Sequence, residues 1–473
     1  MGNNFSNINS PAVFERTGYE LINLLTEELE RSNLLGIGET IQWETPDEQL
    51  KYWENDFASG LIEDPISLFK KIISRSINMN RRGNIGHQIA APYPITVLTS
   101  ALMAHLNNGM GVYEVGMTGN AMEKIIIGKL AGMFGLPEDA AGFITSGGSL
   151  GNLTALLTAK SMFLQQNPEV ALGSMSILVS SEAHYSIERA GKLLGIPSGN
   201  IIKVQVDASF KMKTSLLDSC LNEAKKTGRN VFCIIGSACS TSTGSFDDLV
   251  AIGNFAKSHQ IWFHVDAAHG GPVIFSDLYR YLLNGIEWAD SIILDFHKMM
   301  AVPSLSTALI YRHKHYSRAT FSQDAKYLWR DQEREEWYNS GKQTFECTKP
   351  MSIIHVYTVL RVYGTQIYQE HIDHLYGLAS QFAAMISLRD NFQLLIKPES
   401  NIVCFRYIGG TLEDNEMNRE LQDRIMRDGT FYIVGTTVES NYYLRVSLMN
   451  TRTTLQDLEI LLDMIVGEAS QIK

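Results

Sequence analysis

Short apolar runs that end in polar residues recur along this chain, and they predict the strands of a buried sheet. The two clearest are residues 261–265, which end at Asp266, and residues 291–294, which lead to Lys298. Runs of this length, mostly apolar rather than alternating, are typical of parallel strands buried on both faces. We therefore expect Asp266 and Lys298 to lie near strand ends, which is where open α/β sheets bind their ligands.

Similar apolar runs alternate with helical periodicity over the rest of the chain, which favours an α/β fold. Further strands are predicted at residues 143–144, 175–179, 231–235, 307–311, 403–407, 432–437 and 442–446. Helices are predicted at residues 14–33, 97–106, 121–134, 153–162, 187–194, 351–363, 368–387 and 454–466. Residues 312–341 show no clear periodicity, and so long an irregular connection predicts either an active-site loop or disorder.

An amine and a carboxylate at neighbouring strand ends point to a particular chemistry. A desolvated lysine amine can form a Schiff base with an aldehyde, and a buried carboxylate can keep a pyridinium nitrogen protonated. A lysine at a strand end is, by itself, more often a solvated surface amine, so the inference depends on the pair of Lys298 and Asp266. His297 beside the lysine and the small Ala268 near the aspartate are expected to shape a pocket around the flat ring of pyridoxal phosphate.

The sequence TSGGSLGN at residues 145–152 joins a predicted strand to a predicted helix. Its glycines allow the backbone to approach a ligand closely, and a helix N-terminus offers free N–H groups to a phosphate. Glycine-rich turns before helices are common, so this stretch alone is a weak signal. Together with Lys298 and Asp266 it predicts a phosphate-binding site.

The sequences HVDAAHGG at residues 264–271 and DSIILDFHK at residues 290–298 resemble those of the group II pyridoxal phosphate decarboxylases. That family includes the aromatic amino acid, glutamate, cysteine sulfinate and 2,4-diaminobutyrate decarboxylases. The resemblance implies an α/β fold of fold type I (aspartate aminotransferase-like), with a mostly parallel sheet, helices on both faces and a small C-terminal α+β domain. The implied domains are an N-terminal helical segment (1–85) that packs across a homodimer, a large cofactor-binding domain (86–350) and a small domain (351–473).

The resemblance also implies roles for single residues. Lys298 binds pyridoxal phosphate covalently, Asp266 pairs with its ring nitrogen, His184 stacks on the ring, and Tyr327 returns a proton to the substrate carbon. Thr241 matches a threonine near the ring, although Cys239 stands where the family usually has glycine. The expected cofactor-binding residues are Gly148, Ser149, His184, Thr241, Asp266, Ala268, Asp295, His297 and Lys298.

The function implied by the resemblance is decarboxylation of an L-amino acid to its amine and carbon dioxide, by a carboxy-lyase. Acidic, diamino and aromatic substrates are all candidates, and Tyr93, Tyr113 and Lys349 are expected to contact the substrate. Lys349 stands where glutamate decarboxylases carry an arginine that holds the substrate carboxylate, and a lysine offers a point charge instead of a two-pronged fork. The alternatives are another fold type I reaction (carbon–carbon lyase, acyl transferase or decarboxylating aldehyde synthase) and a non-catalytic binding protein.

Composition narrows the possible partners and the cell compartment. The 473 residues carry a net charge of −11, and no extended basic patch is visible, so we expect no nucleic-acid partner. The five cysteines are scattered without a CxxC pair, which predicts neither a metal site nor a disulfide framework and favours a reducing compartment. No secretory signal and no apolar run of about eighteen residues is present, so we expect a cytoplasmic protein without a membrane segment.

Overall fold

The structure, a computed structural model, describes residues 8–34, 36–321 and 336–472, which form two compact units. The first unit comprises Met1–His87, Ser380–Leu395 and Val403–Lys473, and the second comprises Gln88–Ala379 and Ile396–Ile402. Residues 351–379, which were predicted to lie in the small domain, therefore belong to the unit that contains the larger sheet.

The second unit is built on a seven-stranded sheet with the order β1-β7-β6-β5-β4-β2-β3. Five strands, from β3 to β6 in this order, run parallel, and β7 is antiparallel to both β6 and β1. The strands are β1 (Ala141–Thr145), β2 (Met175–Ser180), β3 (Ile201–Val204), β4 (Asn230–Ser237), β5 (Trp262–Asp266), β6 (Ser291–Asp295) and β7 (Thr307–Tyr311). Every strand predicted for this sheet is confirmed to within two residues at each end, and β3 was not predicted.

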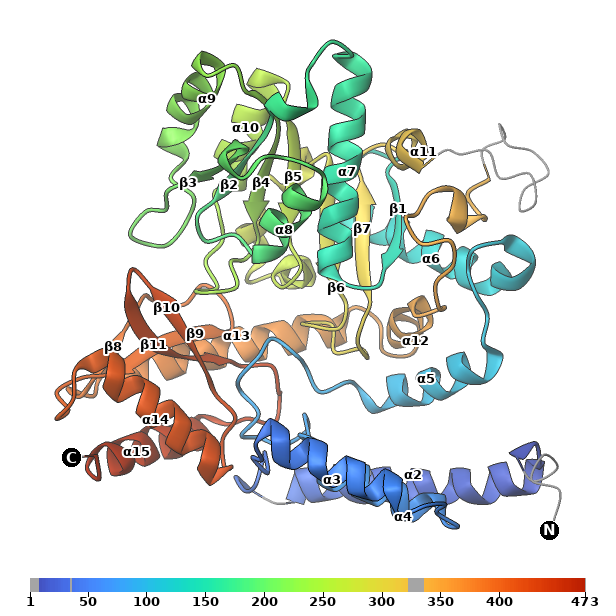
Figure 1. The fold of residues 1–473 in the computed structure, drawn as a ribbon, viewed down its shortest axis with the longest axis vertical. Helices are drawn as coiled ribbons and strands as arrows, with labels where there is room; N and C mark the ends of the chain where they lie inside the picture. The colour runs from blue at the N-terminus through green and yellow to red at the C-terminus, as the bar shows by residue number, and fades with distance from the viewer. Residues whose placement is uncertain (1–7, 35, 322–335, 473) are drawn as a thin grey trace. The chain divides into compact units, whose positions relative to one another are not determined.

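Helices cover both faces of this sheet, as predicted (Figure 1). On one face α7 (Gly148–Gln166) crosses the central strands beside α8 (Tyr185–Leu193), and on the other α10 (Leu249–His259) packs on β4 and β5. Strands β5 and β6 are buried at every position. Neither face of these strands meets water, which is why their sequences are mostly apolar rather than alternating. The remaining helices of this unit are α5 (Pro94–Leu106), α6 (Tyr113–Met133), α9 (Leu217–Lys226), α11 (His315–Phe321), α12 (Ile353–Tyr363) and the first part of α13 (Gln366–Ser387).

Helix α11 corrects the prediction that residues 312–341 form an irregular connection throughout. The ring of Tyr316 in this helix packs on Trp262 of β5, with ring centroids 4.7 Å apart. A tertiary contact of this kind stabilises a short helix that has no visible periodicity of its own.

The first unit combines helices with a smaller sheet of order β10-β11-β9-β8. Its helix α2 (Pro11–Leu34) confirms the predicted N-terminal helix, and the N-caps Thr45 and Asp64 begin α3 (Pro46–Ala58) and α4 (Pro65–Ser74), which were not predicted. The other elements are β8 (Phe392–Leu394), β9 (Ile402–Tyr407), α14 (Asp414–Asp428), β10 (Val434–Val438), β11 (Asn441–Ser447) and α15 (Leu455–Ala469). Within the described residues of both units, none of the helices has the length and apolar character needed to span a membrane.

Candidate active site

A cavity of about 290 Å³ lies in the second unit, where β4, β5 and β6 end. Every residue predicted to bind the cofactor lines this cavity, and the full lining consists of Ser146, Gly147, Gly148, Ser149, Leu150, Asn152, His184, Ser237, Cys239, Thr241, Asp266, Ala268, His269, Asp295, His297, Lys298 and Leu305. The parallel strands bring these side chains together because their carboxyl ends meet at one edge of the sheet.

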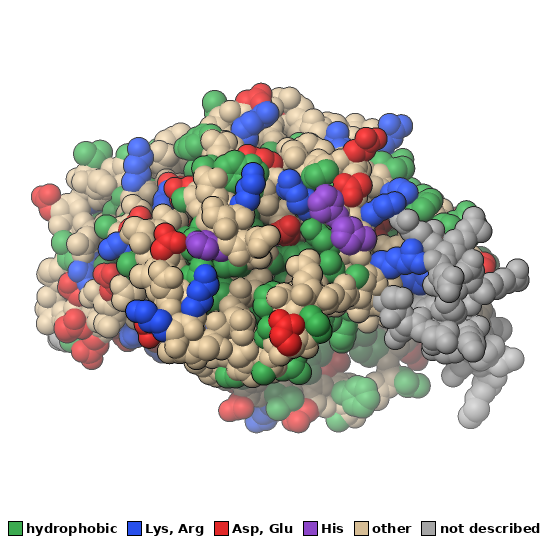
Figure 2. Space-filling model, turned by 90° about the horizontal axis from the view of Figure 1, so that it is seen from above, with side chains coloured by type: hydrophobic (Ala, Val, Ile, Leu, Met, Phe, Trp, Pro, Cys, Tyr) green, Lys and Arg blue, Asp and Glu red, His purple; other side chains and the backbone are tan. Residues whose placement is uncertain are grey.

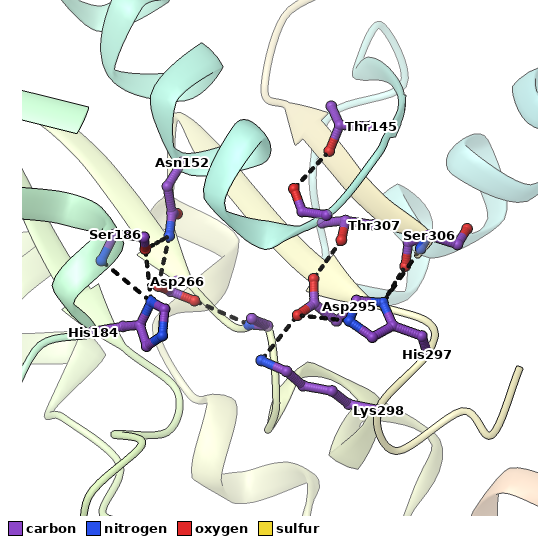
Figure 3. Close-up of polar contacts among 12 residues, drawn as sticks. Thr145, Asn152, His184, Ser186, Asp266, Asp295, His297, Lys298, Ser306 and Thr307 are labelled. Carbon is purple, nitrogen blue, oxygen red and sulfur yellow. Dashed lines mark hydrogen bonds and ion pairs between the residues drawn. The ribbon is translucent and has the colours of Figure 1, made fainter. Parts of the chain in front are cut away.

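Lys298 and Asp295 form a buried ion pair in this cavity (Figure 3). Asp295 ends β6, and its Oδ2 lies 2.9 Å from Lys298 Nζ. Burial alone would lower the pKa of the Lys298 amine, but the nearby Asp295 and Asp266 carboxylates outweigh it and hold that pKa above its usual value. Burial would likewise raise the pKa of Asp295, but Lys298 and His297 lower it below its usual value.

Asp266 ends β5 and faces the same cavity from its other side (Figure 3). Its Oδ2 accepts a hydrogen bond from Asn152 Nδ2 at 2.9 Å, and its Oδ1 accepts one from the Ala268 N–H at 3.2 Å. Only 8% of Asp266 is exposed, so these donors offset part of the cost of burying a carboxylate. The remaining acceptor capacity of the carboxylate is available to a ligand.

His184 is the N-cap of α8 and points into the cavity beside Asp266. Its Nδ1 accepts a hydrogen bond from the Ser186 backbone N–H at 3.3 Å and lies 2.8 Å from Ser186 Oγ. Because Nδ1 is an acceptor, the ring proton is on Nε2. Burial lowers the pKa of His184 despite the opposing effect of Asp266, which favours the neutral imidazole.

Helix α7 begins at the edge of the cavity without a side-chain cap. Its N-cap residue, Gly147, has a φ of 130°, a conformation that favours glycine. A Cβ atom on Gly148 would lie 3.1 Å from Asp295 Oδ1, so a side chain there would crowd the carboxylate. The first turn of α7 lines the cavity, and its free N–H groups suit an anion such as a phosphate.

The structure does not bring Tyr93 or Tyr113 into this cavity. The Tyr93 hydroxyl lies 2.9 Å from His371 Nδ1, while Tyr113 starts α6 and its ring packs against Tyr338. Tyr327, predicted to be the proton donor, lies outside the described residues.

Lys349 also lies outside the cavity lining, in a buried ion pair of its own. Its Nζ is 2.7 Å from Glu123 Oε2 and donates to the Ile144 carbonyl oxygen at 2.8 Å. The side chains of Lys349 and Glu123 are only 4% and 6% exposed. In the structure the lysine charge is thus compensated within the protein rather than presented to a substrate.

Asn152 and Cys239 are among the cavity residues that were not assigned a role from the sequence. Asn152 lies inside α7, because this helix begins at Gly148 rather than at the predicted residue 153. Cys239 is buried, and burial raises the pKa of its thiol to about 12, so it is not a thiolate at neutral pH. The helical spacing from Gly148 to Asn152 was the one available signal that Asn152 faces the cavity. Cys239 gave no signal except that it departs from the family pattern.

The residues of the cavity fit pyridoxal phosphate group by group. The uncapped start of α7 suits the phosphate, the Lys298 amine suits the aldehyde, and the Asp266 carboxylate suits a protonated ring nitrogen. Because Gly148 has no side chain, the backbone at the start of α7 can lie close to Asp295 and to a phosphate bound there.

Comparisons with known proteins bear on the family and the fold of this chain. The conserved domain of the pyridoxal-dependent decarboxylases matches residues 59–408. An aromatic-L-amino-acid decarboxylase of Bacillus atrophaeus is 27% identical over 451 residues (93% of this chain, 92% of the relative), and an L-aspartate decarboxylase of Metarhizium robertsii is 29% identical over 368 residues (76% and 73%). The crystal structure of mouse CSAD superimposes with a TM-score of 0.89 at 22% identity, covering 98% of this chain and 100% of that one, which confirms the predicted fold.

The buried pair of Lys349 and Glu123 generates a prediction about stability. Lys349→Met should lower the free energy of unfolding by about 3–5 kcal/mol, because it leaves the Glu123 carboxylate buried without a counter-charge. The double variant Lys349→Met/Glu123→Gln should recover most of that loss, since glutamine keeps an oxygen for the Ile144 N–H that now donates to Glu123 at 3.0 Å.

Urea denaturation of the wild type, both single variants and the double variant measures this coupling. A Lys349→Met protein of unchanged stability but a much higher KM would contradict the structural role and favour contact with a substrate carboxylate.

Proposed function

Because this chain belongs to the family of pyridoxal-dependent decarboxylases, we propose that the cavity at the ends of β4, β5 and β6 is its active site. The chain is a pyridoxal phosphate-dependent carboxy-lyase that removes the carboxyl group of an amino acid as carbon dioxide and leaves the amine. The observation that carries the placement is the presence of Lys298 and Asp266 in one cavity with the start of α7.

Lys298 is the residue that attaches to the cofactor. Its amine must be neutral to attack an aldehyde, whereas Asp295 stabilises the ammonium form. Lys298 Nζ therefore rests as an ammonium group and would give one proton to solvent before it attacks. Its two remaining hydrogens would leave with the aldehyde oxygen as water, and the same amine would displace the product amine at the end of the reaction.

Asp266 and His184 hold the cofactor ring. When bound, pyridoxal phosphate takes up the electron pair that departing carbon dioxide leaves on the substrate carbon. Asp266 accepts a hydrogen bond from the protonated ring nitrogen, because an adjacent anion favours the charged form. His184 presents a neutral imidazole to the ring face, and Thr241 and Ala268 complete the wall around it.

The identity of the substrate amino acid is open among the classes named from the sequence. One relative is named for aromatic and the other for acidic substrates, and Tyr93, Tyr113 and Lys349 lie outside the lining of the cavity. The role of Tyr327 as proton donor to the substrate carbon stays a prediction.

A direct assay tests the function. Aromatic, acidic and diamino L-amino acids are offered one at a time to the cofactor-loaded enzyme, and amine, carbon dioxide and oxygen are measured. One class should yield amine and carbon dioxide in equal amounts without oxygen consumption. Oxygen consumption in proportion to carbon dioxide would instead indicate an aldehyde synthase, and no carbon dioxide from any class would refute decarboxylation.

The matched variant in this assay is Lys298→Ala, which should show no activity above background. Borohydride reduction followed by peptide mapping should find the pyridoxyl group on Lys298 of the wild type. A label on Lys160 or Lys349 would overturn the assignment.

Asp266→Asn should lower kcat by about a hundredfold to a thousandfold, the usual cost of removing one preorganised electrostatic partner. The variant should still bind the cofactor, because the start of α7 and Lys298 are unchanged. Steady-state kinetics and a cofactor titration measure the two effects separately. Turnover near that of the wild type by a folded Asp266→Asn protein would exclude the proposed role.

We also propose that the chain acts as a homodimer in the cytoplasm. Of the residues of α2 only Ser32 is buried, and Tyr19 and Ile22 are 67% and 43% exposed. A helix with so exposed an apolar face needs a partner surface, which a second copy can supply. All five cysteines are free, which agrees with a reducing compartment.

Sedimentation analysis tests the homodimer. The wild type should sediment at twice the 52.9 kDa of one chain, and Tyr19→Asp should shift the equilibrium toward the monomer. Glu20→Gln, at the neighbouring exposed position on α2, is the control and should leave the mass unchanged. A monomeric wild type at micromolar concentration would refute the dimer.

A further inference from the structure

A chain of hydrogen bonds leads from Asp266 away from the cavity into the core of the second unit. Asn152 Nδ2 lies 2.9 Å from Asp266 Oδ2, and Asn152 Oδ1 lies 2.9 Å from His264 Nε2. His264 Nδ1 lies 2.8 Å from Ser291 Oγ, which in turn accepts from the Trp262 indole N–H at 2.9 Å. All five residues are buried, with Trp262 the most exposed at 9%.

The periodicity of a strand explains why these residues meet. Trp262, His264 and Asp266 are alternate residues of β5, so their side chains point to the same face of the sheet. That face is covered by α7, which contributes Asn152, and the neighbouring strand β6 contributes Ser291.

The two residues at the ends of this hydrogen-bond chain, Trp262 and Asp266, determine the direction of every hydrogen bond in it. The Trp262 indole nitrogen is a donor only, and the Asp266 carboxylate is an acceptor. The orientation of Asn152 follows, because its Nδ2 contacts both Asp266 Oδ2 and Ser186 Oγ, each at 2.9 Å. A flipped amide would set its oxygen against the carboxylate, so Nδ2 faces Asp266 and Oδ1 faces His264.

The proton of His264 is placed by the same reasoning. Asn152 Oδ1 is an acceptor, so His264 Nε2 must donate to it. Burial lowers the pKa of His264 to about 4 despite the attraction of Asp266, so the imidazole is neutral and its Nδ1 carries no proton. Ser291 then donates its hydroxyl hydrogen to Nδ1. In the other tautomer, His264 Nδ1 would donate to the Ser291 carbonyl oxygen, which lies 3.2 Å away. His264 Nε2 and Asn152 Oδ1 would then be two acceptors facing each other with no proton between them.

We propose that the four residues Asn152, His264, Ser291 and Trp262 are positioning residues for the decarboxylase reaction. They hold the Asp266 carboxylate toward the ring nitrogen of the cofactor through a chain in which every hydrogen bond donates toward it. This inference rests on the role proposed above for Asp266. It adds that the tautomer of a histidine outside the cavity lining determines how firmly Asp266 is held.

Asn152 also connects Asp266 to the other side of the cofactor ring. Its Nδ2 donates to Ser186 Oγ, and Ser186 Oγ lies 2.8 Å from His184 Nδ1. Since Ser186 accepts from Asn152, its own hydroxyl hydrogen is free to donate to His184. One amide therefore orients both Asp266 and His184, and hydrogen bonds aligned in one direction strengthen one another.

The position of the protons can be observed without any activity measurement. A neutron structure of the deuterated protein should show deuterium on His264 Nε2 and none on Nδ1, with the Ser291 hydroxyl directed at Nδ1. Deuterium on His264 Nδ1, alone or together with deuterium on Nε2, would refute the proposed direction of the hydrogen bonds.

The effect on the cofactor requires variants and a control. Asn152→Leu should lower kcat about tenfold to a hundredfold, the range found when partners of metal ligands are removed, while KM changes much less. In the same variant the solid-state 15N signal of labelled ring nitrogen should move toward its unprotonated value. Thr158→Val is the control, because it removes another buried bond of α7, the 2.8 Å contact with the Tyr311 hydroxyl, and should leave both readouts unchanged.

The conservative substitution of His264 separates positioning from folding. Glutamine can donate from the place of Nε2, so His264→Gln should retain the ring-nitrogen signal that His264→Leu loses. This pair replaces Asn152→Leu if that variant fails to fold. Equal signals in His264→Gln, His264→Leu and Thr158→Val would overturn the proposal. A wild type that binds the cofactor but decarboxylates nothing would refute the function alone, since the neutron map and the 15N signal would still decide the network.

Discussion

The alternation of side chains along β5 is the constraint on which the active site depends. His264 and Asp266 face α7, while Phe263 between them packs against α10 on the other face of the sheet. In the register of β5 with β6, Asp266 pairs with Ile293. Strand β6 ends two residues after Ile293, at Asp295, and Lys298 follows three residues later. A slip of one residue would exchange Asp266 for an apolar neighbour and would separate the carboxylate from Asn152 and from the cofactor.

The strands and the pair of Lys298 and Asp266 could be predicted from the sequence because they depend on local pattern. A parallel strand that is buried on both faces is mostly apolar, so the polar residues at its end stand out without any tertiary information. The convergence of Asp266, Asp295 and Lys298 then follows from the rule that parallel strands place ligands at their carboxyl ends. The glycine-rich turn before a helix is also a local pattern, and its residues Gly148 and Ser149 line the cavity as predicted.

The missed features depend on partners that are distant in the sequence. Helix α11 is stabilised by the packing of Tyr316 on Trp262, and the sequence around either residue gives no sign of this contact. Lys349 was expected near the substrate, yet Glu123, more than two hundred residues earlier in the chain, compensates its charge in the structure. Asn152 was part of a recognised motif, but its contacts with His264 and Ser186 become visible only when α7 lies across β5.

The balance of charge in the cavity supports the start of α7 as the proposed phosphate site. Lys298 is the only lysine or arginine among the described residues that line the cavity, and it is already paired with Asp295. A phosphate in this cavity would therefore be bound by main-chain N–H groups and the positive end of the helix dipole rather than by an unpaired lysine or arginine of the lining. Asp295 is held by more than its ion pair with Lys298, because it also accepts a hydrogen bond from the Thr307 hydroxyl and its Oδ1 lies beside Gly148 at the positive end of α7. The helix terminus that would hold the phosphate therefore also stabilises the Asp295 carboxylate, and it would continue to do so if Lys298 were attached to the cofactor.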